Sequence, residues 1–285
     1  RTLLPRLVIT DWDYNGATRC FQKGLTNLGI KILTVDHVGM GHSYSHMRNR
    51  KAFSDVVVWG KHDLQGQLKW RKENADITAI GSLRKDHSEL TSSRSHYNKK
   101  EKSQNLLRKP LKVVLFTTQM TYLFGTEVDT SVFQRSWDQL LDLCDRHREW
   151  DVIIKPHPNY DYHSWYKSPK FSRLSNLKVI NTSPKDVLSE ADVAVLHNCS
   201  STVAIDAIGM SVPVIYLNDA KLQGLPPTPI EKYGFIILAD SVKELESYIY
   251  SISTDEIFRK RTLFKQRKFL SNILAATGDE AVCRM

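Results

Sequence analysis

The alternation of hydrophobic and polar positions is clearest after residue 110. Short β-branched runs alternate there with longer segments whose apolar residues recur at the helical period. This alternation predicts a parallel sheet with crossover helices, and runs without polar positions indicate strands covered on both faces. The predicted strands are Lys112–Thr117, Asp151–Lys155, Leu177–Asn181, Val193–His197, Pro213–Leu217 and Phe235–Ala239. The predicted helices are Ser131–Arg148, Pro184–Glu190, Ser201–Gly209, Val242–Ser251 and Asp255–Leu274.

The same pattern predicts a shorter α/β unit in residues 1–83. Its strands are Arg6–Thr10, Lys31–Val35, Ser54–Trp59 and Ile77–Gly81, and its helix is Gly16–Leu28. A sheet this small makes a thin domain, and the chain begins at Arg1 rather than at methionine, so we expect this unit to be incomplete. Residues 84–111 are polar and charged and are predicted to form a basic linker or loop. Residues 112–252 form the predicted doubly wound domain, and residues 253–285 a C-terminal helical tail.

Charge narrows the choice of partners. The chain has 40 Lys and Arg against 31 Asp and Glu, a formal charge of +9, which favours an anionic partner. The excess is concentrated in residues 84–112 and 259–268. These segments are either ordinary solvated surface or contacts to anionic lipid or a lipid-linked acceptor. Nucleic acid is not expected, because no nucleic-acid motif accompanies the charge.

Cysteine usage and hydropathy indicate a compartment. The four cysteines are far apart and include no C-x-x-C pair, which argues against a zinc site or a disulfide framework. No apolar run approaches the roughly 20 residues that span a bilayer. We therefore expect a cytoplasmic protein, either free or peripheral at the inner face of the membrane.

Polar residues follow several predicted strands, where parallel sheets bind their ligands. Lys155 and His157 belong to a K-P-H-P sequence, whose two prolines stiffen the turn. The imidazole can donate to a phosphate or to a ribose hydroxyl, and Lys155 adds positive charge. Thr117 and Thr118 follow another strand and are expected to line the same cleft.

The segment after Val193–His197 contains three hydroxyl residues, Ser200, Ser201 and Thr202, at the start of an apolar helix. One of the two serines is expected to be the N-cap. The free N–H groups and the dipole of a helix N-terminus also suit a phosphate. Asp206 lies in the second turn, where it either orients a ribose hydroxyl or satisfies a neighbouring backbone group.

These motifs resemble the C-terminal domain of GT-B glycosyltransferases of surface-polysaccharide biosynthesis. The similarity is greatest to the branch with CDP-glycerol glycerophosphotransferases, polysialyltransferases and Kdo transferases. His157-Pro158 matches the H-P motif of that branch, and Ser200-Ser201 matches its serine motif; both hold the donor's phosphate and nucleotide. Asp206 occupies the place of a recurrent acidic residue. The resemblance implies two Rossmann-like domains, with donor contacts at Lys155, His157, Pro158, Ser200, Ser201, Thr202, Asp206, Thr117 and Thr118.

The resemblance also implies a reaction: direct displacement of a CMP, CDP or UDP leaving group by a hydroxyl of a glycan or lipid-linked acceptor. His157 and its neighbours would stabilise the leaving phosphate without a cofactor or metal. The general base is His37, His42 or Asp13, all in the first unit, and the sequence leaves the choice open. Asp11 and Asp13 spell a D-x-D pair, but we interpret it as a turn or acceptor-side group.

Two rival functions remain at this point. Non-hydrolysing epimerases of UDP-N-acetylhexosamine share the architecture and need no acceptor. The second rival is a non-catalytic relative that binds nucleotide sugars or acts as a scaffold. The segment after Val35 resembles the family's loop with adjacent His and Gly, but here Val38 separates His37 from Gly39, which favours this rival.

Overall fold

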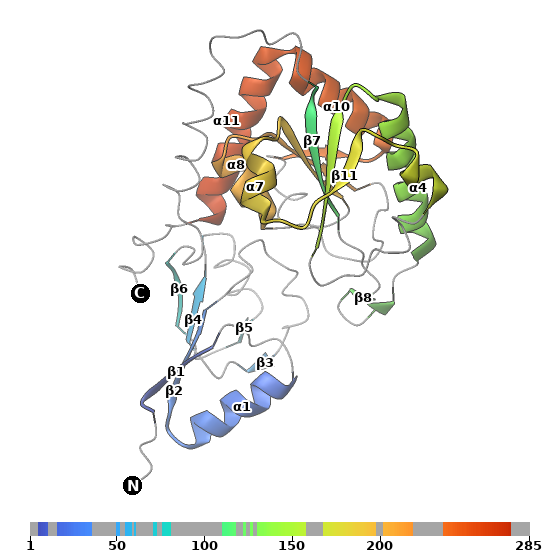
Figure 1. Ribbon diagram of the computed structural model, residues 1–285. Coiled ribbons are helices and arrows are strands. Elements are labelled where there is room, and N and C mark those ends of the chain that lie inside the picture. Colours follow the sequence, from blue (N-terminus) through green and yellow to red (C-terminus); the bar gives the residue numbers. More distant parts are fainter. Residues whose placement is uncertain are drawn as a thin grey trace. The chain divides into compact units, whose positions relative to one another are not determined.

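The computed structural model of the 285-residue chain describes residues 5–10, 16–35, 50–51, 55–58, 60, 71–72, 76–80, 110–117, 122–123, 126–127, 130–157, 168–197, 202–218 and 236–274. The chain divides into two compact units, the first containing residues 1–87 and the second most of residues 88–270 (Figure 1). Among the described helices, none is long and apolar enough to cross a membrane.

The first unit contains a four-stranded parallel sheet in the order β1-β2-β4-β6. Its strands are β1 (Leu7–Thr10), β2 (Lys31–Val35), β4 (Asp55–Val58) and β6 (Ile77–Ala79). Helix α1 (Gly16–Asn27) connects β1 and β2. The two-residue strands β3 (Arg50–Lys51) and β5 (Arg71–Lys72) pair separately. The four predicted strands are confirmed, each with ends within two residues of the prediction.

The second unit contains a six-stranded, all-parallel sheet in the order β11-β10-β7-β12-β13-β14. Its strands are β7 (Lys112–Thr117), β10 (Asp151–Pro156), β11 (Leu177–Val179), β12 (Val193–His197), β13 (Val214–Leu217) and β14 (Ile237–Ala239). Numbered within the unit, this order is 3-2-1-4-5-6, the order of a doubly wound nucleotide-binding sheet. The predicted α/β fold class is confirmed.

The described helices of this unit are α4 (Thr130–Arg146), α6 (Pro169–Ser172), α7 (Pro184–Ser189), α8 (Val203–Gly209), α10 (Val242–Thr254) and α11 (Glu256–Ile273). The short strands β8 (Tyr122–Leu123) and β9 (Thr126–Glu127) form an antiparallel pair. Local sequence explains several helix starts. Ser183 and Asp186 form a capping box around Pro184 at the start of α7, and Ser241 caps α10.

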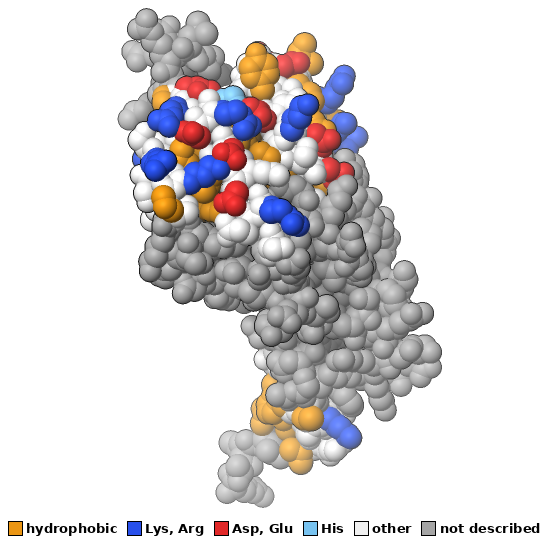
Figure 2. All heavy atoms as spheres, turned by 90° about the vertical axis from the view of Figure 1, so that its right-hand side faces the viewer, with side chains coloured by type: hydrophobic (Ala, Val, Ile, Leu, Met, Phe, Trp, Pro, Cys, Tyr) orange, Lys and Arg blue, Asp and Glu red, His pale blue; other side chains and the backbone are white. Residues whose placement is uncertain are grey.

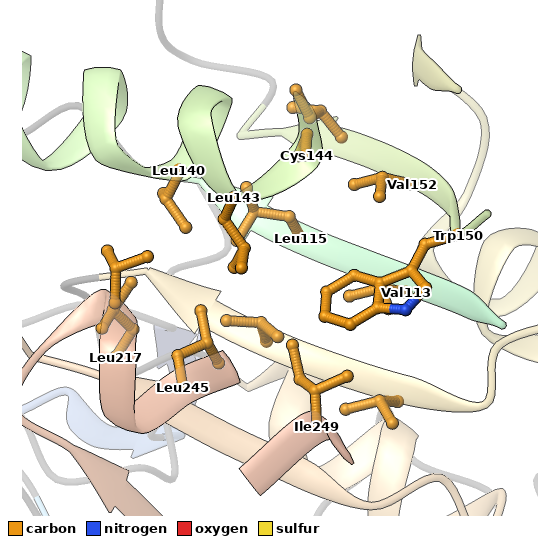
Figure 3. Close-up of a cluster of buried hydrophobic side chains, with 14 of the residues drawn as sticks. Val113, Leu115, Leu140, Leu143, Cys144, Trp150, Val152, Leu217, Leu245 and Ile249 are labelled. Carbon is orange, nitrogen blue, oxygen red and sulfur yellow. The ribbon is translucent and has the colours of Figure 1, made fainter. Parts of the chain in front are cut away.

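The hydrophobic core shows which helices cover which face of the sheet. Alternate strand residues, among them Val113, Leu115, Val152 and Leu217, pack against α4 and α10 (Figure 3). The residues between them face the other way, because successive side chains of a strand point to opposite faces. Helices α7 and α8 contact the strands on that second face. Both faces of the sheet are therefore covered, as its uninterrupted apolar strands predicted.

The core also accounts for one of the two cysteines that the structure describes. Cys144 lies among the α4 side chains, and burial raises the pKa of its thiol to about 12. Cys20, on α1, is exposed, and both are free thiols. The Cys144 thiol therefore stays protonated and serves as a small apolar side chain.

A buried glutamine of helix α11 is hydrogen-bonded to the sheet of the second unit. The side chain of Gln266 is fully buried and forms two hydrogen bonds with the backbone of Val214. Its Oε1 accepts from Val214 N at 3.0 Å, and its Nε2 donates to Val214 O at 2.7 Å. β14 pairs with β13 only from Ile215 onward, so the glutamine amide fills the place of one further strand residue. Residues 253–270 of the predicted tail thus group with this unit.

The end of helix α8 agrees with the prediction. Gly209 is its last helical residue, and Met210 is the C-cap. Ser211 then adopts the left-handed conformation with φ 59°. Ser211 N donates to Ile208 O and Val212 N to Ala207 O, which is the hydrogen-bond pattern of a Schellman motif. The motif therefore uses a serine where glycine is usual.

Candidate functional site

The site is built on the carboxyl ends of three adjacent strands. In the register of the sheet, Thr117 at the end of β7 lies beside Pro156 of β10 on one side and His197 of β12 on the other. The strand order reverses between β7 and β12, and doubly wound sheets bind their ligands at this switch point. Pro156 of β10 and His197 of β12 therefore lie at the same edge, two strand spacings or about 10 Å apart.

One backbone and one side-chain hydrogen bond hold the end of β10. His157 N donates to Thr117 O at 3.1 Å, which extends the ladder between β10 and β7 by one residue beyond Pro156. Lys155 Nζ donates to Pro156 O at 2.8 Å, so the ammonium group is held against the last residue of the strand. This geometry places Lys155 and His157 next to each other at the edge of the sheet, with the imidazole exposed.

The electrostatics of this turn favour an anion. Lys155 is only 7% exposed, and desolvation lowers the pKa of its ammonium group. Desolvation, followed by the repulsion of Lys155, also lowers the pKa of His157. Among the described residues, no carboxylate lies within ion-pair distance of Lys155. An anion bound here would offset the lowering of both pKa values, because a nearby negative charge stabilises the protonated forms.

Side-chain direction separates the residues of this edge. Lys155 alternates with Ile154, which faces α4 and α10, so Lys155 points to the face covered by α7 and α8. Thr117 and His197 lie at positions that face α4 and α10, and both are buried. The structure thus brings Lys155, His157 and Thr117 to one edge but not to one face of the sheet.

Helix α8 starts later than predicted. It begins at Val203, with Thr202 as the N-cap, whereas we expected Ser200 or Ser201 to cap a helix starting at Ser201. Thr202 has helical dihedral angles, and its hydroxyl makes no capping hydrogen bond, so the cap prediction is corrected. Asp206 lies in the first turn rather than the second and is 4% exposed. Its carboxylate is held inside the unit.

A buried serine–histidine pair at this edge was missed by the sequence analysis. Ser136 Oγ on α4 and His197 Nε2 lie 2.5 Å apart, and the two side chains are 4% and 0% exposed. The contact attaches α4 to the end of β12, directly before residues 198–202. A histidine that ends the apolar strand Val193–His197 was itself a signal, because a buried imidazole needs a hydrogen-bond partner.

Asn218 is a second buried polar residue at this edge that the sequence analysis did not single out. It follows β13, is 9% exposed, and its N donates to Ala239 O at 2.9 Å. The signal was available, since it is the first polar residue after a predicted strand.

Several predicted site residues lie outside the part of the chain that the structure describes: Asp11, Asp13, His37, His42, Thr118, Pro158, Ser200 and Ser201. Strand β2 ends at Val35, as predicted, two residues before His37. Their proposed roles stay predictions.

Comparison with known proteins gives a fold. No family model matches the chain, and no curated protein matches it. Solved structures do match. The MnaA–UDP co-structure from S. aureus has a TM-score of 0.60 at 12% identity and covers 98% of this chain and 73% of its own. The UDP-GlcNAc 2-epimerase from Neisseria meningitidis, bound to UDP-GlcNAc, has a TM-score of 0.58 at 10% identity, covering 93% and 74%. The glycotransferase of kitacinnamycin has a TM-score of 0.56 at 14% identity, covering 98% and 74%.

The chain has the GT-B fold. At these identities the likeness is one of architecture, so it does not identify the reaction. It does agree with the sequence analysis, which reached GT-B from the K-P-H-P and serine motifs. Within this GT-B fold, the edge formed by Thr117, His157 and His197 is the carboxyl edge of the second sheet, next to its switch point.

Proposed function

We propose that this chain is a glycosyltransferase-type enzyme that transfers a sugar or polyol-phosphate unit from a CMP-, CDP- or UDP-linked donor. The acceptor is a glycan or lipid-linked hydroxyl in cell-surface polysaccharide synthesis, on the cytoplasmic side of the membrane. The observation that carries the proposal is the K-P-H-P turn. Lys155 and His157, both with lowered pKa, lie side by side at the carboxyl edge of a doubly wound sheet.

The donor's phosphates are proposed to lie between this turn and residues 198–202. The backbone amides at the start of α8 and the hydroxyls of Ser200, Ser201 and Thr202 supply donors from one side. Lys155 and His157 supply positive charge from the other. A phosphate placed there interacts with groups from β10 and from the β12–α8 connection, which flank β7. Asp206 and Thr117 support these contacts from inside the unit.

The proposed chemistry is a direct displacement. The acceptor oxygen forms a bond to the transferred carbon or phosphorus, and the bond from that atom to the nucleotide's phosphate oxygen breaks. The nucleotide leaves with the bonding electrons, and the acceptor's proton passes to a base on the first unit, for which His37, His42 and Asp13 are the proposed residues. Lys155 and His157 stabilise the leaving phosphate, so we propose that no metal or cofactor is required.

Nucleotide titration tests the donor site. We expect His157→Ala to weaken binding of the matching nucleoside diphosphate about tenfold to a hundredfold, the scale of a lost hydrogen bond to a charged group. Turnover should fall at least as much. His147→Ala is the matched control, because His147 follows α4 at the opposite edge of the sheet, beside the start of β10, and should leave binding unchanged. Unchanged binding and turnover in His157→Ala would remove this residue from the mechanism.

Proton uptake gives a second readout. Since the pKa of His157 is lowered in the free protein, an anionic donor should raise it and bind a proton with it. Calorimetric titrations in buffers of different ionisation enthalpy should show this uptake near and below pH 6.5. His157→Ala should abolish it. Activity that disappears in a chelator and returns with a divalent cation would overturn the metal-independent form of the proposal.

The UDP-GlcNAc 2-epimerase reaction is a second candidate, because epimerase structures are among those with TM-scores above 0.5. Incubation with UDP-GlcNAc alone discriminates between the two: an epimerase converts it without an acceptor. Binding of none of CMP, CDP and UDP would instead favour the non-catalytic alternative.

A further inference from the structure

The outward side of helix α11 combines positive charge with large apolar side chains. Ile257, Arg261, Phe264 and Lys268 recur at helical spacing and therefore lie along one side, called here the α11 stripe. Ile257 is 75% exposed and Phe264 62%. The side facing the core carries the buried residues Thr262, Gln266 and Leu270. The stripe is thus the solvent side of a helix that is anchored to the second unit by its opposite side.

The exposed apolar side chains are concentrated in one stretch of the second unit. Among its described residues, the exposed large hydrophobic side chains are Tyr250, Ile257 and Phe264, at the end of α10 and on α11. The Nζ of Lys268 lies 4.9 Å from the centre of the Phe264 ring, so the charge and the apolar surface are contiguous.

The charged side chains of α11 are almost all positive. Its 18 residues include six Lys or Arg and a single acidic residue, Glu256, which pairs with Lys260 at 2.7 Å. Among the described residues, no carboxylate lies within ion-pair distance of Arg261 or Lys265. The charges of Arg261 and Lys265 are therefore not neutralised by the part of the chain that the structure describes.

The face formed by α4 and its neighbours provides the contrast. There, basic and acidic side chains alternate over the surface (Figure 2). Arg146 pairs with Glu246 at 2.7 Å, and Lys170 pairs with Asp142. Helix α4 itself has two Arg against three Asp. This is how the protein treats an ordinary solvated surface, and α11 departs from it in both charge and apolar exposure.

We propose that the α11 stripe binds the anionic surface of a lipid bilayer, with Ile257 and Phe264 among the headgroups and the flanking Lys and Arg on anionic phosphates. Bulky apolar side chains next to basic ones are the composition of helices that lie in the membrane interface. Nucleic acid would use the charge but would leave Ile257 without a role. The inference rests on the proposed function and adds to it the place of the acceptor, because a lipid-linked acceptor lies in a membrane surface of this kind.

Co-sedimentation with vesicles tests the inference. We expect the protein to bind vesicles of phosphatidylcholine mixed with phosphatidylglycerol and to bind phosphatidylcholine alone far more weakly. The triple variant Arg261→Gln, Lys265→Gln, Lys268→Gln should lower the partition coefficient about a hundredfold, given the usual contribution of each basic side chain near an anionic surface. The matched control Arg135→Gln, Arg173→Gln, Lys243→Gln removes the same charge from exposed positions elsewhere and should bind nearly as well as the parent.

Salt separates the two contributions. High salt shortens the Debye length from about 10 Å to about 3 Å between 0.1 M and 1 M, so it should remove most of the charge-dependent binding. The double variant Ile257→Ser, Phe264→Ser should lose the salt-resistant remainder. Circular dichroism melts of all variants check that they fold, which is expected because every substituted side chain is solvent-exposed or lies on the outward stripe.

Three outcomes would overturn the inference: equal binding to neutral and anionic vesicles, equal loss in the control triple variant, or tighter binding to a nucleic acid of matched charge than to the vesicles. Nucleotide titrations on the same samples keep the proposals distinguishable. If nucleotides bind and vesicles do not, the stripe inference fails alone. If vesicles bind and no nucleotide does, the proposed function fails and the stripe stands.

Discussion

The two parallel sheets of this chain differ in how well their faces are covered. In the first unit, Leu7 and Ile9 of β1 are 49% and 55% exposed, and Phe21 and Leu28 around α1 are similarly open. In the second unit, β12 and β13 are buried along their whole length. The comparison teaches that the second unit holds most of the hydrophobic stabilisation described, and that the candidate site lies at the edge of this well-covered sheet. A rigid sheet of this kind can hold Lys155 and His157 in place.

The largest effect should come from one of two matched Ile→Ala substitutions, one in each sheet. Ile154→Ala in β10 removes a side chain that is 1% exposed and should lower the free energy of unfolding by about 2–5 kcal/mol. Ile9→Ala in β1 removes a half-exposed side chain and should cost below about 0.5 kcal/mol. Hydrogen exchange measured segment by segment reports each unit separately. Equal losses in the two variants would contradict the comparison.

The next effect concerns the link between α11 and the second sheet. Gln266→Leu leaves the N–H and C=O of Val214 without their partner in a buried place, and should cost about 2–4 kcal/mol. Lys265→Leu, at the exposed neighbouring position, is the control and should be nearly neutral. Urea unfolding of the two variants measures the difference. A neutral Gln266→Leu would show that α11 is not needed to complete the sheet.

The helix ends of the two units provide a smaller contrast. Helix α1 ends in a Schellman motif with Gly29 at φ 72°, and α8 ends in the same motif with Ser211 at φ 59°. We expect Gly29→Ala to destabilise by about 1 kcal/mol, because alanine is strained at positive φ. Ser211→Gly should be more stable than Ser211→Ala by about 0.5–1 kcal/mol. Both variants lose the hydroxyl that accepts from Arg267, so this pair isolates the backbone term. In thermal melts, Gly29→Ala should unfold at a lower temperature than the parent, and Ser211→Gly at a higher temperature than Ser211→Ala.

The smallest effect concerns pH and the contact between α4 and α10. Desolvation acts to lower the pKa of His147, but its hydrogen bonds with Glu246 and Glu149 outweigh this, and the pKa is raised above 6.5. A raised pKa means that the folded state binds the proton more tightly. The resulting stability is therefore full below pH 6.5 and is lost as pH rises through the folded pKa. His147→Phe keeps the stacking on Trp150 and should remove this dependence, a few tenths of a kcal/mol. If the free energy of unfolding of His147→Phe depended on pH as that of the parent does, His147 would not be the source of the dependence.

The sequence predicted the sheets well because their signal is local. Uninterrupted apolar runs such as Val193–His197 define strands covered on both faces, and caps such as Ser183 with Asp186 define helix starts. The two-residue strands β3, β5, β8 and β9 were not predicted, because two residues are too few to show a period. Helix α6 was also missed, although Ser168 and Pro169 have the sequence of a helix start.

The site was predicted only as far as strand ends allow. Lys155 and His157 could be placed at the carboxyl edge, because all strands of a parallel sheet end there. The contact between Ser136 and His197 could not, because it joins residues 61 positions apart and depends on how α4 lies on the sheet. The burial of Gln266 could not be predicted either, because a polar residue in a basic helix is expected to face water. Both residues form contacts that exist only after the helices have packed.

The two hydrogen bonds of Gln266 tie the identity of one helix residue to the length of one strand. Because its amide stands in for a missing residue of β14, a homologue whose β14 starts one position earlier would have backbone groups of its own to offer Val214. Glutamine would then be redundant, and an aliphatic side chain would fill the space better. Position 266 and the number of residues between β13 and β14 are therefore expected to vary together across evolution, as a covariation between a side chain and a gap.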